Sequence, residues 1–135
     1  MALLRTYRVF ISHAWRYSSD YSRVVRFLNE APNFRWENLS VPEHDPLSNH
    51  DLEYELRNQM RLAEVFIIIG GMYVNHSASI DFEFSFARRI GCPIIAIWPW
   101  GSVRMPASLS QAAVQTVGWN GASIVSAIRR HARRT

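Results

Sequence analysis

Polar and aromatic residues follow the ends of four predicted strands, and these are the residues most able to do chemistry. They form four short segments: Ser12 to Trp15, Ser40 to Asp45, Gly70 to Tyr73 and Trp98 to Gly101. Because the carboxyl ends of parallel strands meet at one edge of a sheet, ligands of open α/β sheets bind there. Aromatic rings beside a few hydrogen-bonding groups suit a nucleotide or a nucleoside.

Histidines at this edge could supply acid–base or metal chemistry. None of the five has HxxxH or cysteine-linked spacing, so we expect no metal site; they are His13, His44, His50, His76 and His131. His44 and Asp45 are adjacent and could form an acid–base pair, although no serine in a nucleophile-elbow motif accompanies them. A local hydrogen bond explains His44 equally well. Likewise, three tryptophans could stack on a base or pack in the core: Trp15, Trp98 and Trp100.

Several enzyme classes are excluded by residues that the chain lacks. All 15 basic residues are arginine, which removes Schiff-base chemistry, a lysine nucleophile and a Walker lysine. No GxGxxG follows the first predicted strand, so dinucleotide binding of the Rossmann type is unsupported. A response regulator would need an aspartate after the VFIII segment, where this chain has Gly70.

Alternating strand-like and helix-like patterns must position these residues, and they predict an α/β fold. Residues 65–69 (VFIII) and 93–98 (PIIAIW) are continuous apolar runs, typical of strands covered on both faces. Residues 34–41 alternate in polarity, as a half-exposed edge strand does. With residues 7–12 and 113–117, they predict one domain over residues 1–135, a three-layer, flavodoxin-like sandwich with a five-stranded parallel sheet.

Three further segments have the apolar spacing of amphipathic helices. Their expected N-terminal caps are Ser18 or Ser19, the pair Ser48 and Asp51, and Asn120. Their inward sides comprise Tyr21, Val24, Val25 and Leu28; Leu52, Leu56 and Met60; and Ile124, Val125 and Ile128.

Residues 80–86 (IDFEFSF) place aromatic residues at a period of two, which by itself is typical of a strand. We nevertheless expect a helix, because a crossover between two parallel strands needs one here. A helix with aromatics on several sides must bury more than the stripe that faces the sheet. A second copy of the chain, in a homo-oligomer, is one candidate for covering the rest.

Composition indicates a compact intracellular domain. Hydrophobic residues make up 48% of the chain, and the single cysteine, Cys92, suits a reducing compartment. The first residues contain no apolar run long enough for a signal peptide, and no later stretch approaches a membrane span. We therefore expect a cytoplasmic protein with no membrane partner.

The positive charge is concentrated in the last residues. Removing four arginines takes the formal charge from +4 to zero; they are Arg129, Arg130, Arg133 and Arg134. Because helix C-termini favour cations, we interpret this tail as a solvated end of the last helix, over residues 129–135. We expect no nucleic-acid partner, and we expect the tail to be dispensable for catalysis.

The order of several blocks resembles the TIR-like proteins of bacterial Thoeris anti-phage defence, the ThsB family. The blocks are VFISHAW, SVPEHDP, VFIIIGGMY, SASIDFEFSFA, GCPIIAIWPWG and VGWN. The resemblance covers nearly the whole chain and implies a TIR-like version of the predicted sandwich. Enzymatic TIR domains cleave NAD+ at the nicotinamide–ribose bond, and Thoeris members release cyclic or otherwise modified ADP-ribose signals.

The resemblance also implies a catalytic residue. In TIR enzymes the catalytic glutamate follows a serine by six residues, often as S-x-W-x-x-x-E; Ser77 and Glu83 hold those positions here, and Ser79 replaces the tryptophan. NAD+ would be the substrate, with no separate cofactor, and the VPEHDP loop would form a lid with Asp45 near a ribose. The expected substrate-binding residues are Ser12, His13, Trp15, Ser40, His44, Asp45, Met72, Tyr73 and Ser77.

Two other functions remain open. A non-catalytic TIR-like adaptor would assemble through the aromatic helix and the loops. An enzyme resembling nucleoside deoxyribosyltransferases would also break an N-glycosidic bond with a glutamate. An NAD+-cleaving enzyme would act through a separate effector protein that receives the nucleotide product; the sequence specifies neither the product nor the activator.

Overall fold

The computed structural model describes residues 5–12, 19–40, 50–70, 77–98 and 104–134. In these residues, five strands form one parallel sheet with the order β2-β1-β3-β4-β5. The strands are β1 (Thr6–Ser12), β2 (Arg35–Asn38), β3 (Val65–Ile69), β4 (Ile94–Ile97) and β5 (Gln115–Val117). The predicted five-stranded parallel sheet is confirmed, and each strand lies within a residue of its predicted range or inside it.

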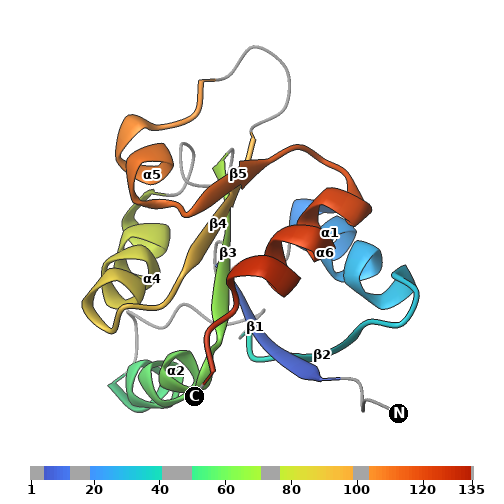
Figure 1. Cartoon of the computed structure of the whole chain (residues 1–135). Helices are drawn as coiled ribbons and strands as arrows, with labels where there is room; N and C mark the ends of the chain where they lie inside the picture. The colour runs from blue at the N-terminus through green and yellow to red at the C-terminus, as the bar shows by residue number, and fades with distance from the viewer. Residues whose placement is uncertain (1–4, 13–18, 41–49, 71–76, 99–103, 135) are drawn as a thin grey trace.

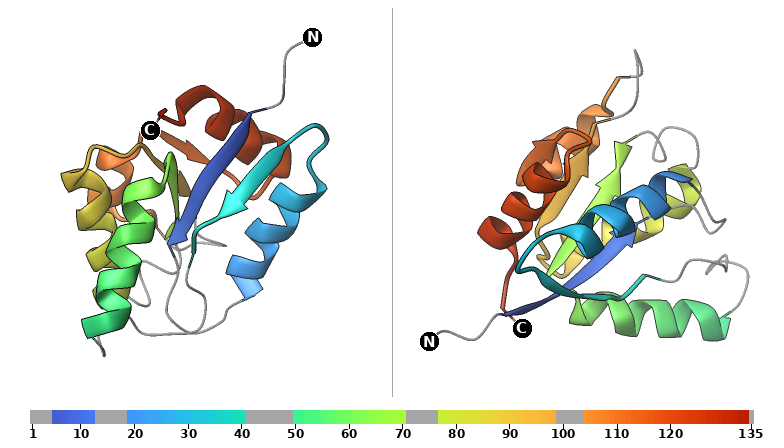
Figure 2. Two further views of the ribbon diagram at one scale, coloured as in Figure 1. Left: turned by 90° about the horizontal axis from the view of Figure 1, so that it is seen from below. Right: turned by 90° about the vertical axis from the view of Figure 1, so that its right-hand side faces the viewer.

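Helices cover both faces of the sheet and make three layers (Figure 1; Figure 2). On one face lie α1 (Ser19–Glu30) and α6 (Gly121–His131). On the other lie α2 (His50–Leu62), α4 (Ser77–Arg89) and α5 (Ala107–Ala112). None of the described helices has the length and apolar character needed to cross a membrane. Residues 80–86 lie within α4, so the crossover argument predicted this helix correctly although the sequence pattern is typical of a strand.

The alternation of side chains along the strands divides the core into two layers. Val9, Ile11 and Ile67 belong to the cluster beneath α1 and α6. Phe10 and Phe66 point to the opposite face, where they stack with ring centroids 4.9 Å apart. Each fully buried apolar side chain of this size contributes about 1.5–3 kcal/mol relative to an exposed one. The central strands are therefore held from both sides, as their continuous apolar sequence predicts.

Two predicted local features are confirmed. Asn120 caps α6, and its side chain accepts a hydrogen bond of 3.0 Å from the backbone N–H of Ser123. β2 lies at the edge of the sheet, and three of its four residues are exposed. The expected cap at Ser18 and the capping box at Ser48 lie outside the described residues, and so does the side chain of Leu52.

The aromatic side chains of α4 are covered within the chain itself. Phe84 and Phe86 are buried, each 5% exposed. Guanidinium groups lie over the rings: Arg88 over Phe84 at 5.7 Å and Arg61 over Phe86 at 5.6 Å. These arginines and the core beneath α4 therefore cover the aromatic rings that lie outside the stripe of α4 facing the sheet.

The strand order creates a switch point at the centre of the sheet. From β1 the chain passes through α1 to β2 on one side, and from β3 it passes through α4 to β4 on the other. The helices α1 and α4 lie on opposite faces, so the carboxyl ends of β1 and β3 border the place where the connections diverge. Ligands of doubly wound folds bind at this place.

Candidate active site

A buried carboxylate lies at the switch point. Glu83, on α4, is 6% exposed, and Ser12, the last residue of β1, is fully buried. The Ser12 hydroxyl donates a hydrogen bond to Glu83 Oε1. Burying a carboxylate is costly unless other groups hydrogen-bond to it, so this pair is a candidate for a functional role.

The local sequence explains why these two side chains meet. On α4, Ile80, Glu83, Phe84 and Ala87 follow helical spacing and are all buried, so Glu83 belongs to the stripe that faces the sheet. On β1, Ser12 lies two residues after Phe10, so it points to the same face as Phe10, the face covered by α4. Helix α4 packs against both β1 and β3.

A chain of polar contacts supports the neighbouring strand end. The Ser40 hydroxyl accepts a hydrogen bond of 2.8 Å from the backbone N–H of Ile11. The Ser40 N–H donates to the Asn38 side chain at 2.9 Å, and Asn38 Nδ2 donates to the Tyr21 hydroxyl at 2.8 Å. This chain of contacts fixes the backbone of β1 immediately before Ser12.

Of the predicted site residues, the structure brings Ser12 and Glu83 into contact and places Ser40 beside the same strand. Ser77 begins α4, but its side chain is outside the described part of the chain. Six further candidates lie wholly outside the described residues: His13, Trp15, His44, Asp45, Met72 and Tyr73. Tyr21 and Asn38 were not predicted to take part, because their pairing joins a helix to a strand end without any sequence motif.

Trp98 is an exposed aromatic residue just after β4. Its side chain is 46% exposed. Its backbone is fixed on both sides: its N–H donates to the Val117 carbonyl at 2.9 Å, and its carbonyl accepts from Trp119 Nε1 at 2.8 Å. A flat ring held at the carboxyl end of the sheet can stack on a base. The exposure favours stacking over the alternative of core packing.

The other cavities and side-chain clusters of the described chain are weaker candidates for an active site. A groove of about 440 Å³ lies between α1 and α6, on the opposite face of the sheet from Glu83, with Phe27 and Val125 in its lining. Among the described residues, no group of three His, Cys, Asp or Glu side chains could hold a metal ion.

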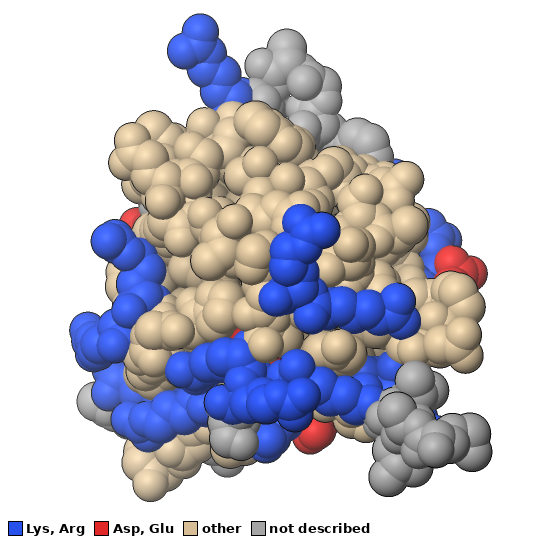
Figure 3. All heavy atoms as spheres, in the orientation of Figure 1, with Lys and Arg blue, Asp and Glu red and all other residues tan. Residues whose placement is uncertain are grey.

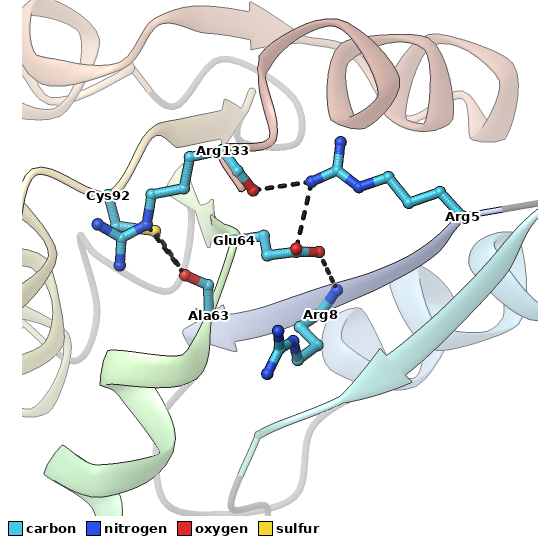
Figure 4. A network of polar contacts seen from close by, with 6 residues as sticks. All are labelled: Arg5, Arg8, Ala63, Glu64, Cys92 and Arg133. Atoms are coloured by element: carbon cyan, nitrogen blue, oxygen red, sulfur yellow. Dashed lines mark hydrogen bonds and ion pairs between the residues drawn. The ribbon is translucent and has the colours of Figure 1, made fainter. Parts of the chain in front are cut away.

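The other buried glutamate, Glu64, lies at the opposite end of the sheet, just before β3 (Figure 4). Its Oε1 accepts a hydrogen bond of 2.9 Å from the backbone N–H of Arg8, and its Oε2 lies 3.2 Å from Arg5 Nη2. The Glu64 N–H in turn donates to the Arg8 carbonyl at 2.8 Å. These contacts tie the start of β1 to the start of β3, which is a structural role.

Arg133 joins this network from the C-terminal segment (Figure 4). Its Nε donates to the Ala63 carbonyl at 3.2 Å and its Nη1 to the Ile90 carbonyl at 2.9 Å. Its backbone N–H donates to the Glu64 carbonyl at 2.9 Å, and its own carbonyl accepts from Arg5 Nη2 at 2.7 Å. The interpretation of the tail as a solvated helix end holds for the exposed Arg129 and Arg130, in the last turn of α6, but it is wrong for Arg133. Helix α6 ends at His131, and Arg133 binds carbonyls that carry no signal in the sequence.

Cys92 lies beside this network and is not a candidate nucleophile. Its thiol donates weakly to the Ala63 carbonyl at 3.5 Å. Burial raises the pKa of the Cys92 thiol to about 12, and the nearby Arg133, which lowers it, does not compensate. Because the thiolate is the reactive form, this thiol is inert at neutral pH.

Comparison with known families assigns the part of the chain that contains this site to one family. A family model described as Thoeris protein ThsB, TIR-like domain, matches residues 10–104. The chain belongs to this family. The matched region includes Ser12, Ser40 and Glu83, whereas α6 and Arg133 lie beyond it. The chain therefore has a TIR-like domain of the Thoeris defence type. No curated protein matches the chain.

Proposed function

We propose that this ThsB-family domain cleaves NAD+ at the nicotinamide–ribose bond, with Glu83 as the catalytic carboxylate. The observation that carries the proposal is the buried Glu83 side chain, hydrogen-bonded to Ser12 at the switch point of the sheet. The sequence supports it independently, because Glu83 follows Ser77 at the spacing of NAD+-cleaving TIR enzymes.

The chemistry needs one carboxylate. When the glycosidic C–N bond of NAD+ breaks, its electron pair neutralises the positive charge on the nicotinamide ring, so no general acid is required. The ribose carbon becomes cationic and resembles an oxocarbenium ion, as in glycoside hydrolysis. A fixed negative charge in a site that excludes water stabilises that cation more strongly than it would in water. The Ser12 hydroxyl holds the carboxylate in one orientation.

The nucleophile decides the product. Attack by a ring nitrogen or hydroxyl of the same molecule gives a cyclic ADP-ribose, whereas attack by water gives ADP-ribose and releases a proton. Excluding water from the site would favour cyclisation. We propose a cyclic or modified ADP-ribose as the product, acting as an anti-phage signal on a separate effector protein in the cytoplasm. Trp98 is the described residue best placed to stack on a base.

The test measures NAD+ consumption and nicotinamide release by the purified protein, with and without extract from phage-infected cells. Glu83→Gln keeps the side-chain shape and removes the charge. Loss of one such electrostatic contact costs about 10²–10³ in rate. Glu30→Gln is the matched control, since Glu30 is exposed at the end of α1 and should leave turnover unchanged.

Two outcomes would overturn the proposal. Parent-like turnover by Glu83→Gln would remove this residue from the chemistry. A parent protein that consumes no NAD+ even with infected-cell extract would favour the adaptor function.

A further inference from the structure

Ten of the 15 arginines gather at the amino-terminal end of the sheet, opposite Glu83. Helices of a doubly wound sheet run antiparallel to the strands, so their last turns lie at this end. The last turns of α2, α4 and α6 contribute five arginines: Arg61, Arg88, Arg89, Arg129 and Arg130. The beginnings of β1 and β2 and the C-terminal segment contribute five more: Arg5, Arg8, Arg35, Arg133 and Arg134.

This end forms a broad basic face. Figure 3 shows arginine atoms gathered across the lower part of the molecule, with few acidic atoms among them. Seven of the ten are exposed: Arg35, Arg61, Arg88, Arg89, Arg129, Arg130 and Arg134. Within the described residues, no carboxylate forms an ion pair with any of these seven. The buried Glu64 is held by Arg5 and the backbone of Arg8.

Helix dipoles account for only part of this charge. Each helix C-terminus carries about −0.5 charge. Five helices end here, α1, α2, α4, α5 and α6; together they supply about −2.5, and the exposed Glu30 adds one more negative charge. Seven exposed guanidinium groups therefore leave an excess of about +3.5. This excess includes arginines from three elements outside the C-terminal tail, so it is a property of the folded face.

From this face we infer that the domain binds the phosphate backbone of double-helical nucleic acid. One planar guanidinium group can donate two parallel N–H hydrogen bonds to two oxygens of the same phosphate. The arginines are attached to the ends of rigid elements, which suits a regular, rigid array of phosphates.

Two observations argue against a single-stranded nucleic acid and against an acidic protein as the partner. Single-stranded nucleic acids are held by exposed aromatic rings that stack on bases, but at this end guanidinium groups cover the rings, as Arg5 covers Tyr7 at 4.6 Å and Arg129 covers Phe34 at 5.6 Å. A protein interface of standard size needs an apolar centre. Among the described residues, the large apolar side chains exposed at this end are those of Leu62 and Val114, which are too few.

The experiment is a fluorescence anisotropy titration of a labelled 20-base-pair DNA duplex at several salt concentrations. The parent should bind with a Kd of about 10⁻⁴–10⁻⁶ M, weakening steeply with salt. The test variant is Arg89→Ala/Arg130→Ala, in which both side chains are exposed and neither forms a hydrogen bond or ion pair with another described residue. It should bind more weakly, and its log–log salt slope should be shallower by about 2.

The matched control is Arg26→Ala/Arg104→Ala, which removes the same charge from exposed positions outside this face. Its salt slope should equal the parent's. The inference fails if the parent does not bind the duplex at 50 mM salt, or if both double variants lose affinity equally. It also fails if polyglutamate or a single strand competes as well as the unlabelled duplex, which would indicate an acidic protein partner or a stacked strand. The titration measures DNA binding and needs no NAD+, so these results are independent of the proposed reaction.

Discussion

The described chain buries two glutamates at opposite ends of one sheet, and they are held differently. At the amino end, Glu64 is bound by a guanidinium and a backbone N–H that also join three segments of the chain. At the carboxyl end, Glu83 is bound by the neutral hydroxyl of Ser12. Glu64 thus holds segments of the chain together, whereas Glu83 lies at the switch point, where ligands of doubly wound folds bind. The comparison predicts that one end governs stability and the other governs turnover.

The largest expected effect separates turnover from stability at Glu83. Glu83→Gln should lower NAD+ turnover by about 10²–10³, while its denaturant midpoint stays equal to the parent's or rises, because a buried charge is removed. Turnover and urea denaturation, measured on the same preparation, test this. A large fall in the denaturant midpoint would show that Glu83, like Glu64, mainly stabilises the fold, and it would contradict the proposed difference between the two glutamates.

Arg133→Ala should give the reverse result. It removes two side-chain hydrogen bonds to the carbonyls of Ala63 and Ile90, and hydrogen bonds made by a charged donor contribute a net stabilisation of about 1.5–3 kcal/mol each. We expect a loss of about 3 kcal/mol in the free energy of unfolding, with turnover unchanged where the variant is folded. Arg134→Ala, at an exposed neighbour, is the control and should match the parent in denaturation.

Glu64→Gln should have a smaller effect of the same kind. The amide retains one acceptor for the Arg8 N–H but loses its attraction to Arg5, which is partly exposed. We expect a loss of about 2 kcal/mol in stability and parent-like turnover per folded molecule. If turnover fell while the unfolding midpoint did not, the two ends of the sheet would be coupled.

Ser12→Ala should lower kcat about tenfold, equal to about 1.4 kcal/mol, because the carboxylate loses the hydroxyl that orients it. KM should change little, since Ser12 is fully buried and its hydroxyl is bonded to Glu83, so it orients the carboxylate instead of contacting the substrate as the sequence suggested. Ser40→Ala is the matched control: its hydroxyl accepts from the backbone of Ile11, so that variant should lose stability without a selective loss in kcat. Equal kinetic effects at both serines would contradict an orienting role for Ser12.

The last effect is confined to alkaline pH and is absent near neutrality. The pKa of the Cys92 thiol is raised from 9.0 to about 12 in the folded chain. Above pH 9 the unfolded chain loses this proton while the folded chain keeps it, so stability falls as pH rises from 9 toward 12. The slope for one proton cannot exceed about 1.4 kcal/mol per pH unit. Cys92→Ala should flatten the pH dependence of the unfolding midpoint over this range, and an unchanged slope would exclude the thiol as its cause.

Prediction from the sequence worked best where many residues carry the same signal. Continuous apolar runs predicted β3 and β4, and the need for a crossover predicted α4 against its own period-two pattern. Glu83 could be selected by resemblance, but its bond to Ser12 joins residues 71 positions apart and needed the fold to be seen. Arg133 was misjudged because its partners are backbone carbonyls, which every residue has. The gathering of arginines was missed because it brings together the ends of separate elements.

The hydrogen bond between Arg5 and the Arg133 carbonyl closes a loop of 128 residues. Closing so long a loop costs chain entropy that is repaid only after the sheet between the two residues exists. We therefore expect the contact to form late in folding and to be absent from the transition state. Interactions of that kind leave the folding rate unchanged and slow unfolding. The segment around Arg133 should therefore lower the unfolding rate of the chain and leave its folding rate nearly unchanged.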